Sequence, residues 1–176
     1  MKNSGIEKNA ASTIAELMCA AARTAPKARG RDNLLYAIIT EDTEKEQIAK
    51  VMEQIAAEEP NRVKVMTRDA QGIRKCMALL LFGTKFAYYD LNCSFCGWPT
   101  CEQAKQHRAQ CIYAAHDLGL AIGSACAIAG VHHIDNRVMY SVGYAARKMK
   151  LLGDDAGIIF GIPLSITGKN IFFDRA

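Results

Sequence analysis

The stretch Met77-Ala-Leu-Leu-Leu-Phe-Gly83 is a continuous apolar run that ends at a glycine. A run of this kind, without polar alternation, is typical of a strand that is covered on both faces. Two more apolar runs of strand length, 34–40 and 157–162, stand on either side of it in the sequence. The sequence therefore predicts a sheet in which residues 77–82 form a buried strand.

The first helix is expected over residues 8–24. Apolar side chains recur there at helical spacing, namely Ile14, Leu17, Met18 and Ala21. Pro26 then ends the helix, and residues 27–33 follow as a basic loop.

A second helix is expected over residues 43–59, where Thr43 and Glu46 have the spacing of a capping box. Two more helices are expected at about 111–130 and 138–149. Strands and helices thus mix along the whole chain. We predict an α/β (α+β) fold with a mixed sheet flanked by helices, as a single domain over residues 1–176.

Composition narrows the class of protein. Half of the 176 residues are hydrophobic, which is enough for a core without disulfide bonds. The net charge of +4 comes from scattered basic residues, so we expect no nucleic-acid partner. The polar first residues lack the apolar segment of a signal peptide, and the most apolar stretch, 112–131, reads as a buried helix. We therefore expect a cytoplasmic protein with no membrane partner.

Seven cysteines in such a chain need an explanation other than disulfide bonds, because a reducing compartment keeps thiols free. Four of them crowd into residues 93–111, and these are Cys93, Cys96, Cys101 and Cys111. The other three, Cys19, Cys76 and Cys126, stand alone in apolar surroundings and are expected to be small buried side chains.

The crowded cysteines have the pattern Cys-x2-Cys-x4-Cys-x9-Cys. A pair separated by two residues can turn both thiolates toward one centre. Gly97 allows the backbone to come close to the sulfurs, and Pro99 stiffens the loop. Four thiolates are the usual ligands of an iron–sulfur cluster. We therefore predict a [4Fe–4S] cluster on these cysteines, in a module at about residues 90–112.

The spacing of the last two ligands adds a geometric prediction. A straight helix would place Cys101 and Cys111 about 15 Å apart, which is too far for one cluster. Residues 102–110 must therefore turn back, and Cys111 is expected at the start of the long helix. A structural zinc site would need the same four thiolates and stays open as an alternative.

The string Cys-x-x-Cys-Gly-x-Pro-x-Cys resembles the [4Fe–4S] motif of electron-transport subunits with ferredoxin-like modules. Over nearly its whole length, the chain resembles a family of uncharacterised bacterial and archaeal proteins with a ferredoxin domain. The matching pieces are the segment 22–30, the cysteine loop, and the segments 117–125, 135–137 and 160–165.

A further resemblance is to the nitroreductase type of flavoprotein. An Ala-rich helix that ends in Ala-Pro, the Ala/Gly-rich helix in the second half and the late Gly-x-Pro carry it. The resemblance implies FMN, a homodimer and a flavin at the dimer interface. The residues that we expect to hold the flavin phosphate by charge-assisted hydrogen bonds are Arg23, Lys27, Arg29 and Gly30, together with Arg31 and Lys169. Solvated basic side chains on a surface loop are the other interpretation of this set.

These expectations lead to three hypotheses. The first is an iron–sulfur redox protein that transfers electrons to a redox partner protein or a small-molecule acceptor, with FMN as its substrate-facing centre. The second is a non-enzymatic electron carrier or sensor. The third is a structural protein with a four-cysteine zinc site. No catalytic residue follows from the sequence.

Overall fold

A computed structural model of the chain describes residues 5–173. The elements follow one another in the order α1 (Ile6–Thr24), η1 (Ala28–Gly30), β1 (Leu34–Ile39), α2 (Asp42–Glu58), η2 (Pro60–Arg62), α3 (Val63–Lys75), β2 (Ala78–Lys85), α4 (Cys101–Gln106), α5 (Ile112–Val131), β3 (Asp135–Asn136), α6 (Tyr140–Lys148) and β4 (Ala156–Ser165). The predicted mixture of helices and strands is confirmed, and so are strands at all three apolar runs.

The four strands form one sheet in the order β1-β2-β4-β3. Every strand pair among the described residues is antiparallel, so the predicted mixed sheet is wrong in this respect. The reason is physical. An apolar run shows that a strand is covered on both faces, but it does not show which way the neighbouring strands run.

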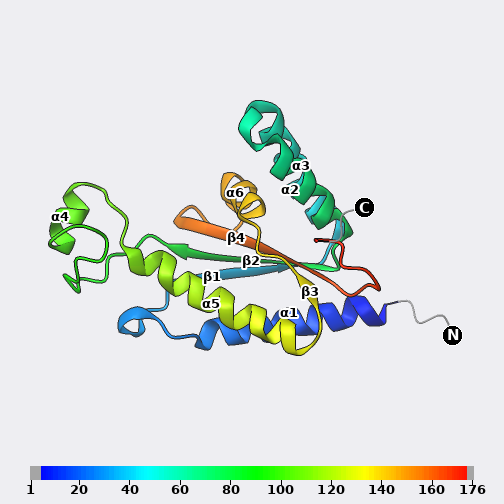
Figure 1. Cartoon of the computed structure of the whole chain (residues 1–176), viewed down its shortest axis with the longest axis horizontal. Helices are drawn as coiled ribbons and strands as arrows, with labels where there is room; N and C mark the ends of the chain where they lie inside the picture. The colour runs from blue at the N-terminus through cyan, green and yellow to red at the C-terminus, as the bar shows by residue number, and fades with distance from the viewer. Residues whose placement is uncertain (1–4, 174–176) are drawn as a thin grey trace.

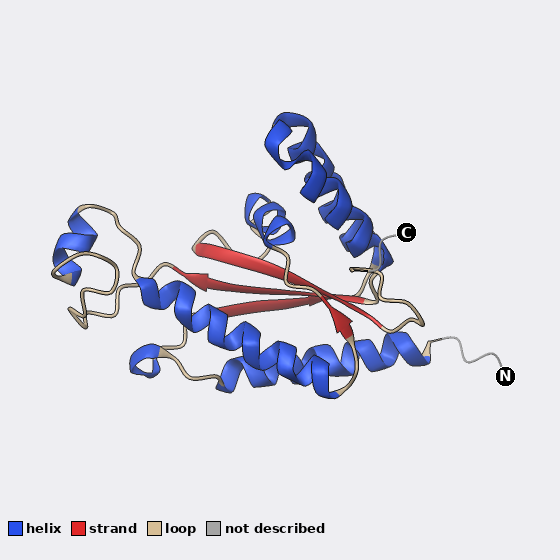
Figure 2. Cartoon of the chain, viewed as in Figure 1, coloured by secondary structure: helices blue, strands red, loops and turns tan. Residues whose placement is uncertain are grey.

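Helices cover both faces of this sheet, as Figures 1 and 2 show. Alternate residues of β2 point to opposite sides, and all of them are buried from Ala78 to Thr84. Leu80 and Phe82 belong to the core under α1 and α5, whereas Leu79 and Leu81 belong to the core under α2, α3 and α6. The apolar run of β2 is thus the centre of a three-layer fold.

Two details of the predicted helices are wrong. Leu17 is predicted on the buried face of α1, but 46% of it is exposed. The buried face instead carries small residues, among them Ala11, Ala15 and Ala22, because α1 packs closely along α5. The predicted capping box also fails, because α2 begins at Asp42 and Glu46 forms an ion pair with Arg74 of α3.

Helix α3 is not among the helices predicted above. Its buried residues Met66, Asp69, Ala70 and Ile73 have the spacing of one helical face, but that face includes a carboxylate and the segment is polar as a whole. Buried Asp69 accepts a hydrogen bond from the Ser141 hydroxyl on α6, so a polar contact joins these two helices.

Candidate metal centre

The cysteine loop, residues 86–111, lies between β2 and α5 and contains α4. It extends from one end of the sheet, away from the packed layers (Figure 1). Cys111 is the residue that precedes the first turn of α5, so the predicted position at the start of the long helix is confirmed. The predicted reversal between Cys101 and Cys111 is also confirmed, since α4 ends at Gln106 and Arg108 then adopts a φ of 53°.

Three contacts tie the two sides of this loop together. The Tyr88 hydroxyl donates to the Ala109 carbonyl at 2.6 Å, and Lys105 donates to Asp90 at 2.8 Å. The Cys101 amide donates to the Asn92 side-chain oxygen at 2.8 Å. The loop is therefore cross-linked from its base to its tip by its own polar groups.

The tip has an unusual backbone. Asp90, Asn92, Ser94 and Gly97 all have positive φ values, between 47° and 84°. Only glycine adopts this conformation at no steric cost, although Asn and Asp tolerate it better than most other residues. Such conformations occur in tight turns and are also concentrated at functional sites, so they make this loop a candidate binding site.

The four sulfurs have different surroundings. Cys101 accepts a hydrogen bond from the Asn92 amide, with 3.4 Å between nitrogen and sulfur. Burial, together with the nearby thiols of Cys93 and Cys111, raises the pKa of Tyr113, so both cysteines lie near this tyrosine. Cys96 is half-buried next to Gly97, where an added Cβ would meet no atom within 4 Å.

The donor set fits an iron–sulfur cluster by its chemistry. Four free thiols lie on one short loop, and one of them already accepts a backbone N–H bond, which is a contact that stabilises a thiolate. Within residues 5–173, however, no three Cys, His, Asp or Glu side chains converge to metal-binding distance. The structure brings the four cysteines into one loop but not to ligating distances, so a metal held by all four would require the loop to tighten.

The remaining cysteines lie in the packed layers. Burial raises the pKa of Cys19 to about 11 and that of Cys76 to about 12, and it also raises the pKa of Cys126. All three therefore stay protonated thiols at neutral pH, as small core side chains do. The His107 ring, at the end of α4, stacks on the Trp98 ring with 4.3 Å between the ring centroids.

The basic loop, residues 27–33, lies beside the base of the cysteine loop, and its cations are bonded within the protein. Arg23 donates to Asp32 and to the Leu34 carbonyl. Lys27 donates to three carbonyls at the end of α1, those of Ala22, Arg23 and Ala25. We expected these two residues to bind phosphate. Instead, Lys27 caps the carbonyls at the end of α1, and Arg23 stabilises the turn before β1.

Arg29 and Arg31 reach across to the cysteine loop. Arg29, which has a φ of 54°, donates from Nη1 to the Tyr89 carbonyl at 2.9 Å. Arg31 donates from Nη1 to the Tyr88 carbonyl at 3.1 Å. Gly30, between them, has a φ of 65° and forms the turn. The basic loop thus holds the polypeptide that leads into the cysteine loop.

Lys169 lies elsewhere. The basic loop leads into Leu34, which pairs with Thr84, whereas Lys169 follows β4 and the Ala78–Leu164 pair at the other end of β2. The structure therefore does not bring Lys169 together with the other expected phosphate-binding residues. The single phosphate clamp expected from the sequence is not formed within one chain.

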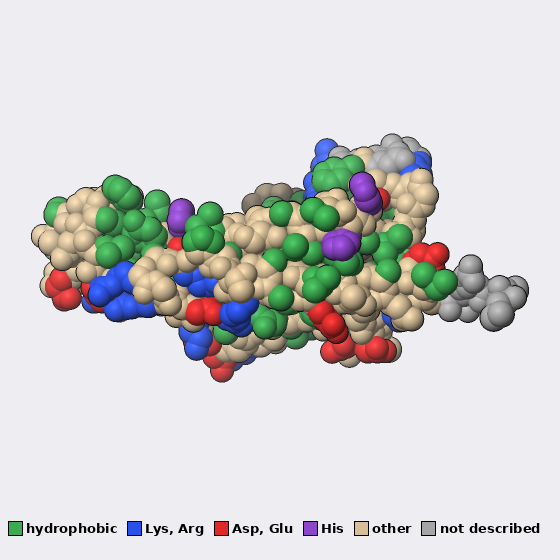
Figure 3. All heavy atoms as spheres, turned by 90° about the horizontal axis from the view of Figure 1, so that it is seen from below, with side chains coloured by type: hydrophobic (Ala, Val, Ile, Leu, Met, Phe, Trp, Pro, Cys, Tyr) green, Lys and Arg blue, Asp and Glu red, His purple; other side chains and the backbone are tan. Residues whose placement is uncertain are grey.

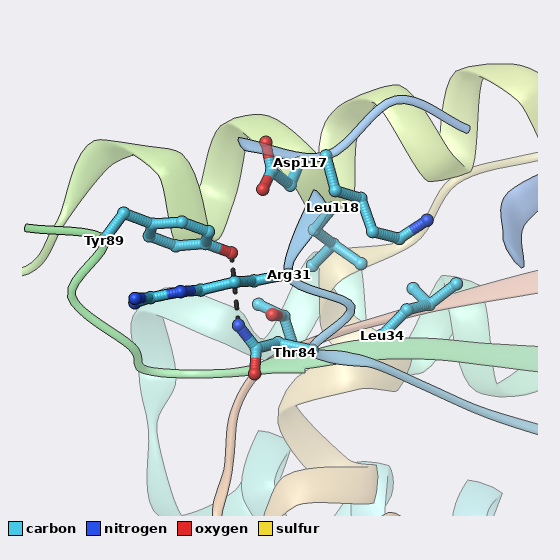
Figure 4. A pocket seen from close by; sticks show the side chains of 8 residues that line it. Arg31, Leu34, Thr84, Tyr89, Asp117 and Leu118 are labelled. Atoms are coloured by element: carbon cyan, nitrogen blue, oxygen red, sulfur yellow. Dashed lines mark hydrogen bonds between the residues drawn. The ribbon is translucent and has the colours of Figure 1, made fainter. Parts of the chain in front are cut away.

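Behind the two loops lies a buried polar group to which the sequence assigned no role. The Asp117 carboxylate on α5 accepts a hydrogen bond from the Ala28 amide at 2.9 Å. The Tyr89 hydroxyl accepts a hydrogen bond from Asn33 at 3.2 Å, and Asp117 lies on the other side of this hydroxyl (Figure 4). Burial and the neighbouring Asp117 raise the pKa of Tyr89, which is 1% exposed. A cavity of about 10 Å³ between these residues has room for about one water molecule, so it does not hold a flavin ring.

Helix α5 separates this region from solvent. By length and composition it is the one helix among the described residues that could cross a membrane, but one face packs against α1 and the sheet. The opposite face is exposed and carries no Asp, Glu, Lys or Arg. Its residues are Ile112, Ala115, His116, Gly119, Leu120, Gly123, Ala127, Gly130 and Val131.

Comparison with known proteins identifies the family. Residues 107–175 match the family described as "uncharacterized protein containing a ferredoxin domain" (DUF2148). A protein of Archaeoglobus fulgidus, also described as uncharacterized, is 38% identical over 184 aligned positions, which cover 99% of this chain and 94% of that protein. The chain belongs to this ferredoxin-domain family. The resemblance seen in the sequence is thereby confirmed.

Solved structures confirm the nitroreductase-type fold of this family member. A BluB-like flavoprotein from Clostridium difficile superposes with a TM-score of 0.60 at 20% identity, over 90% of this chain and 81% of that one. Nitroreductase A from Vibrio parahaemolyticus (TM-score 0.59, 13% identity) and the NADPH:FMN oxidoreductase of Vibrio harveyi (TM-score 0.59, 11% identity) each match 90% of this chain. This chain spans only 59% and 60% of those two proteins. Identities this low establish the shared fold and nothing more.

Proposed function

We propose that this protein is a cytoplasmic iron–sulfur redox protein that holds one [4Fe–4S] cluster on Cys93, Cys96, Cys101 and Cys111. The observation that carries the proposal is a loop that combines four free thiols, left-handed backbone at its tip and an amide that already donates to Cys101. Membership of the ferredoxin-domain family supports it. A bound cluster of this type accepts and releases single electrons.

The chain's own residues would perform three tasks in this function. The four cysteines would bind as thiolates, and the Asn92 amide would stabilise the charge on Cys101. Tyr113 would lie next to Cys93 and Cys111 and contribute part of the wall of the site. Arg29 and Arg31 would hold the base of the loop against the core. We infer that residues 1–176 act as one domain, with about 90–112 as the iron–sulfur module.

The test is a visible spectrum of protein purified without oxygen, with iron, sulfide and zinc measured on the same sample. About four irons and four sulfides per chain, with broad absorption that bleaches on reduction, are expected. Zinc with a featureless spectrum would make the chain a structural metalloprotein and would contradict the proposal.

A second candidate function is an FMN-dependent reductase, and the fold shared with flavoproteins favours it. The side chains of Arg23 and Lys27 are already bonded, and the cavity beside them holds about one water molecule. A flavin site would therefore have to draw on a second chain. Flavin released from anaerobically purified protein on acid denaturation would support this function, and iron without flavin would favour a simple electron carrier.

We also propose a homodimer, as the resemblance to nitroreductase-type flavoproteins implies, with the exposed face of α5 as its contact. The face is apolar and lined with small residues that allow two helices to approach closely. An added Cβ at Gly123 would meet no atom of its own chain within 4 Å. Gly123→Arg should therefore leave the protomer folded and shift its mass in light scattering from dimer to monomer. A dimer in both proteins would exclude this face.

A further inference from the structure

The cysteine loop exposes apolar side chains at its tip. Phe95, between the first two cysteines, is 70% exposed, and Leu91, two residues before Cys93, is 42% exposed. Figure 3 shows hydrophobic side chains gathered at the end of the molecule where this loop lies, with basic side chains beside them. Large apolar side chains grouped in this way on a protruding loop mark a contact surface more often than ordinary protein surface.

The basic side chains beside this tip surround a single carboxylate. A hydrogen bond from Lys105 and the charges of Arg31 and Arg29 together lower the pKa of Asp90, so all three cations lie around it. Glu102, an exposed carboxylate that also acts on Lys105, lies on the same loop, as does the exposed cation Arg108. Four cations against two carboxylates leave a net positive charge on this side of the loop.

Two of these cations are held in place before any partner arrives. Arg29 and Arg31 each use one N–H group on the carbonyls of Tyr89 and Tyr88. A guanidinium has five N–H donors, so most of those on each arginine remain available. Because their orientation is already fixed, little conformational entropy is lost when they bind a carboxylate.

An apolar centre with a charged rim is the usual anatomy of a protein–protein contact. A second copy of this chain would bring the same cations against each other, so this surface does not suit an isologous pair. A partner with acidic side chains around an apolar patch matches both the apolar centre and the basic rim of this surface. Since Phe95 stands between Cys93 and Cys96 in the sequence, such a partner would dock next to these two cysteines.

We propose that the tip of the cysteine loop, with Phe95 at its centre and Arg29, Arg31 and Lys105 on its rim, is the docking surface for a small acidic electron-carrier protein. The inference rests on the proposed function, because the docked carrier exchanges electrons with the cluster. One electron leaves the reduced iron–sulfur or flavin carrier, which is thereby oxidised, and enters the cysteine-bound cluster, which is thereby reduced. No bond forms or breaks, and no proton is required for the balance.

The experiment measures binding of two probes, an acidic clostridial-type ferredoxin and an acidic flavodoxin, to the full chain by anaerobic calorimetry at low and high salt. Phe95→Ala should weaken binding about tenfold at both salt concentrations, as the loss of an aromatic anchor does. Lys105→Gln should weaken binding several-fold at low salt and have little effect at high salt. Val63→Ala on α3 and Lys50→Gln on α2 replace exposed side chains away from the loop and should bind as the wild type does.

Iron is measured in every sample, which separates the two proposals. A variant that keeps its iron but loses the carrier supports the docking surface. Salt-sensitive binding by a protein without iron would leave the docking surface intact and contradict the cluster. Failure to bind either probe, equal losses in the control variants, or binding to anionic phospholipid vesicles in place of both carriers would overturn the docking proposal.

Discussion

The cysteine loop and the basic loop lie side by side, and the sequence predicted a cofactor site in each. In the cysteine loop, the four thiols are free, and several residues of the backbone have positive φ values. In the basic loop, Lys27 is bonded to carbonyls of the same chain, and Arg23, on the adjoining end of α1, is bonded to Asp32 of the loop and to the Leu34 carbonyl. Clustered basic residues can either bind a ligand or stabilise their own chain, so their presence alone does not predict a binding site. Thiols crowded on a loop have few uses other than metal binding, so they predict a site more specifically.

The largest expected effect is loss of the metal from the cysteine loop. Cys96→Ser should abolish or severely reduce cluster binding, because a serine hydroxyl at neutral pH is a poor replacement for a thiolate. Cys19→Ser, a matched change in the packed layers, should keep full iron content because Cys19 lies in the core under α1. Iron and sulfide are measured in both variants. Equal iron in the two would contradict the assignment of Cys96 as a cluster ligand.

The next effect joins the two loops. Arg29→Ala removes the bond to the Tyr89 carbonyl that holds the base of the cysteine loop. Removing such an outer support of a metal site typically lowers metal affinity about 10- to 100-fold. We therefore expect faster loss of iron to a chelator, with the secondary structure unchanged in circular dichroism. Arg29→Lys keeps one donor and should recover part of the retention.

The same variant tests the original interpretation of the basic loop. If Arg29 binds a flavin phosphate instead, Arg29→Ala should lower flavin content and leave iron retention as in the wild type. Changed iron retention with unchanged flavin assigns Arg29 to the cysteine loop. The outcome thus decides which of the two loops this side chain serves.

A smaller effect is expected at Asn92, which supplies two separate features. Its side chain accepts the Cys101 amide, and its backbone has a φ of 47°. Asn92→Gly keeps the backbone conformation and removes only the side-chain bond, whereas Asn92→Ala removes the bond and adds strain. We expect iron retention in the order wild type, Gly, Ala. If the Gly variant were the weaker binder, backbone shape would not be what the loop requires.

Several features of the fold and of the cysteine loop could be predicted from the sequence. The apolar run at 77–82 identifies a strand covered on both faces, and the crowding of the cysteines by itself indicates a metal-binding loop. The reversal before Cys111 followed from the rise of a helix, and the position of Cys111 just before α5 from the preference of a thiolate for the positive end of a helix. These features depend on residues close together in the sequence, so a local pattern is enough to reveal them.

The missed features depend on residues far apart in the sequence. The bond from Ala28 to Asp117 joins positions 89 residues apart, and no local pattern predicts it. For the same reason, the sequence showed that Arg29 is basic but did not show that its partner is the Tyr89 carbonyl, 60 residues away. Whether a basic side chain is available to a ligand is decided by the fold, and composition alone does not reveal it.

The smallest effect concerns the internal anchor of the basic loop. Burial alone would raise the pKa of Asp32, but hydrogen bonds from Arg23 and the Leu34 amide lower it below its ordinary value of 3.8. A carboxyl whose pKa is lower in the folded than in the unfolded chain stabilises the fold above its unfolded pKa, and this contribution is lost as the pH falls through the folded pKa. Asp32→Asn should therefore reduce the free energy of unfolding at neutral pH by no more than about 1 kcal/mol, since the pair is near the surface. The difference from wild type, measured by urea titration of the metal-free proteins, should shrink below about pH 4 as the wild-type carboxyl is protonated. A difference that persisted at low pH, or that appeared only in protein loaded with metal, would show that the basic loop is held by something other than its own ion pairs.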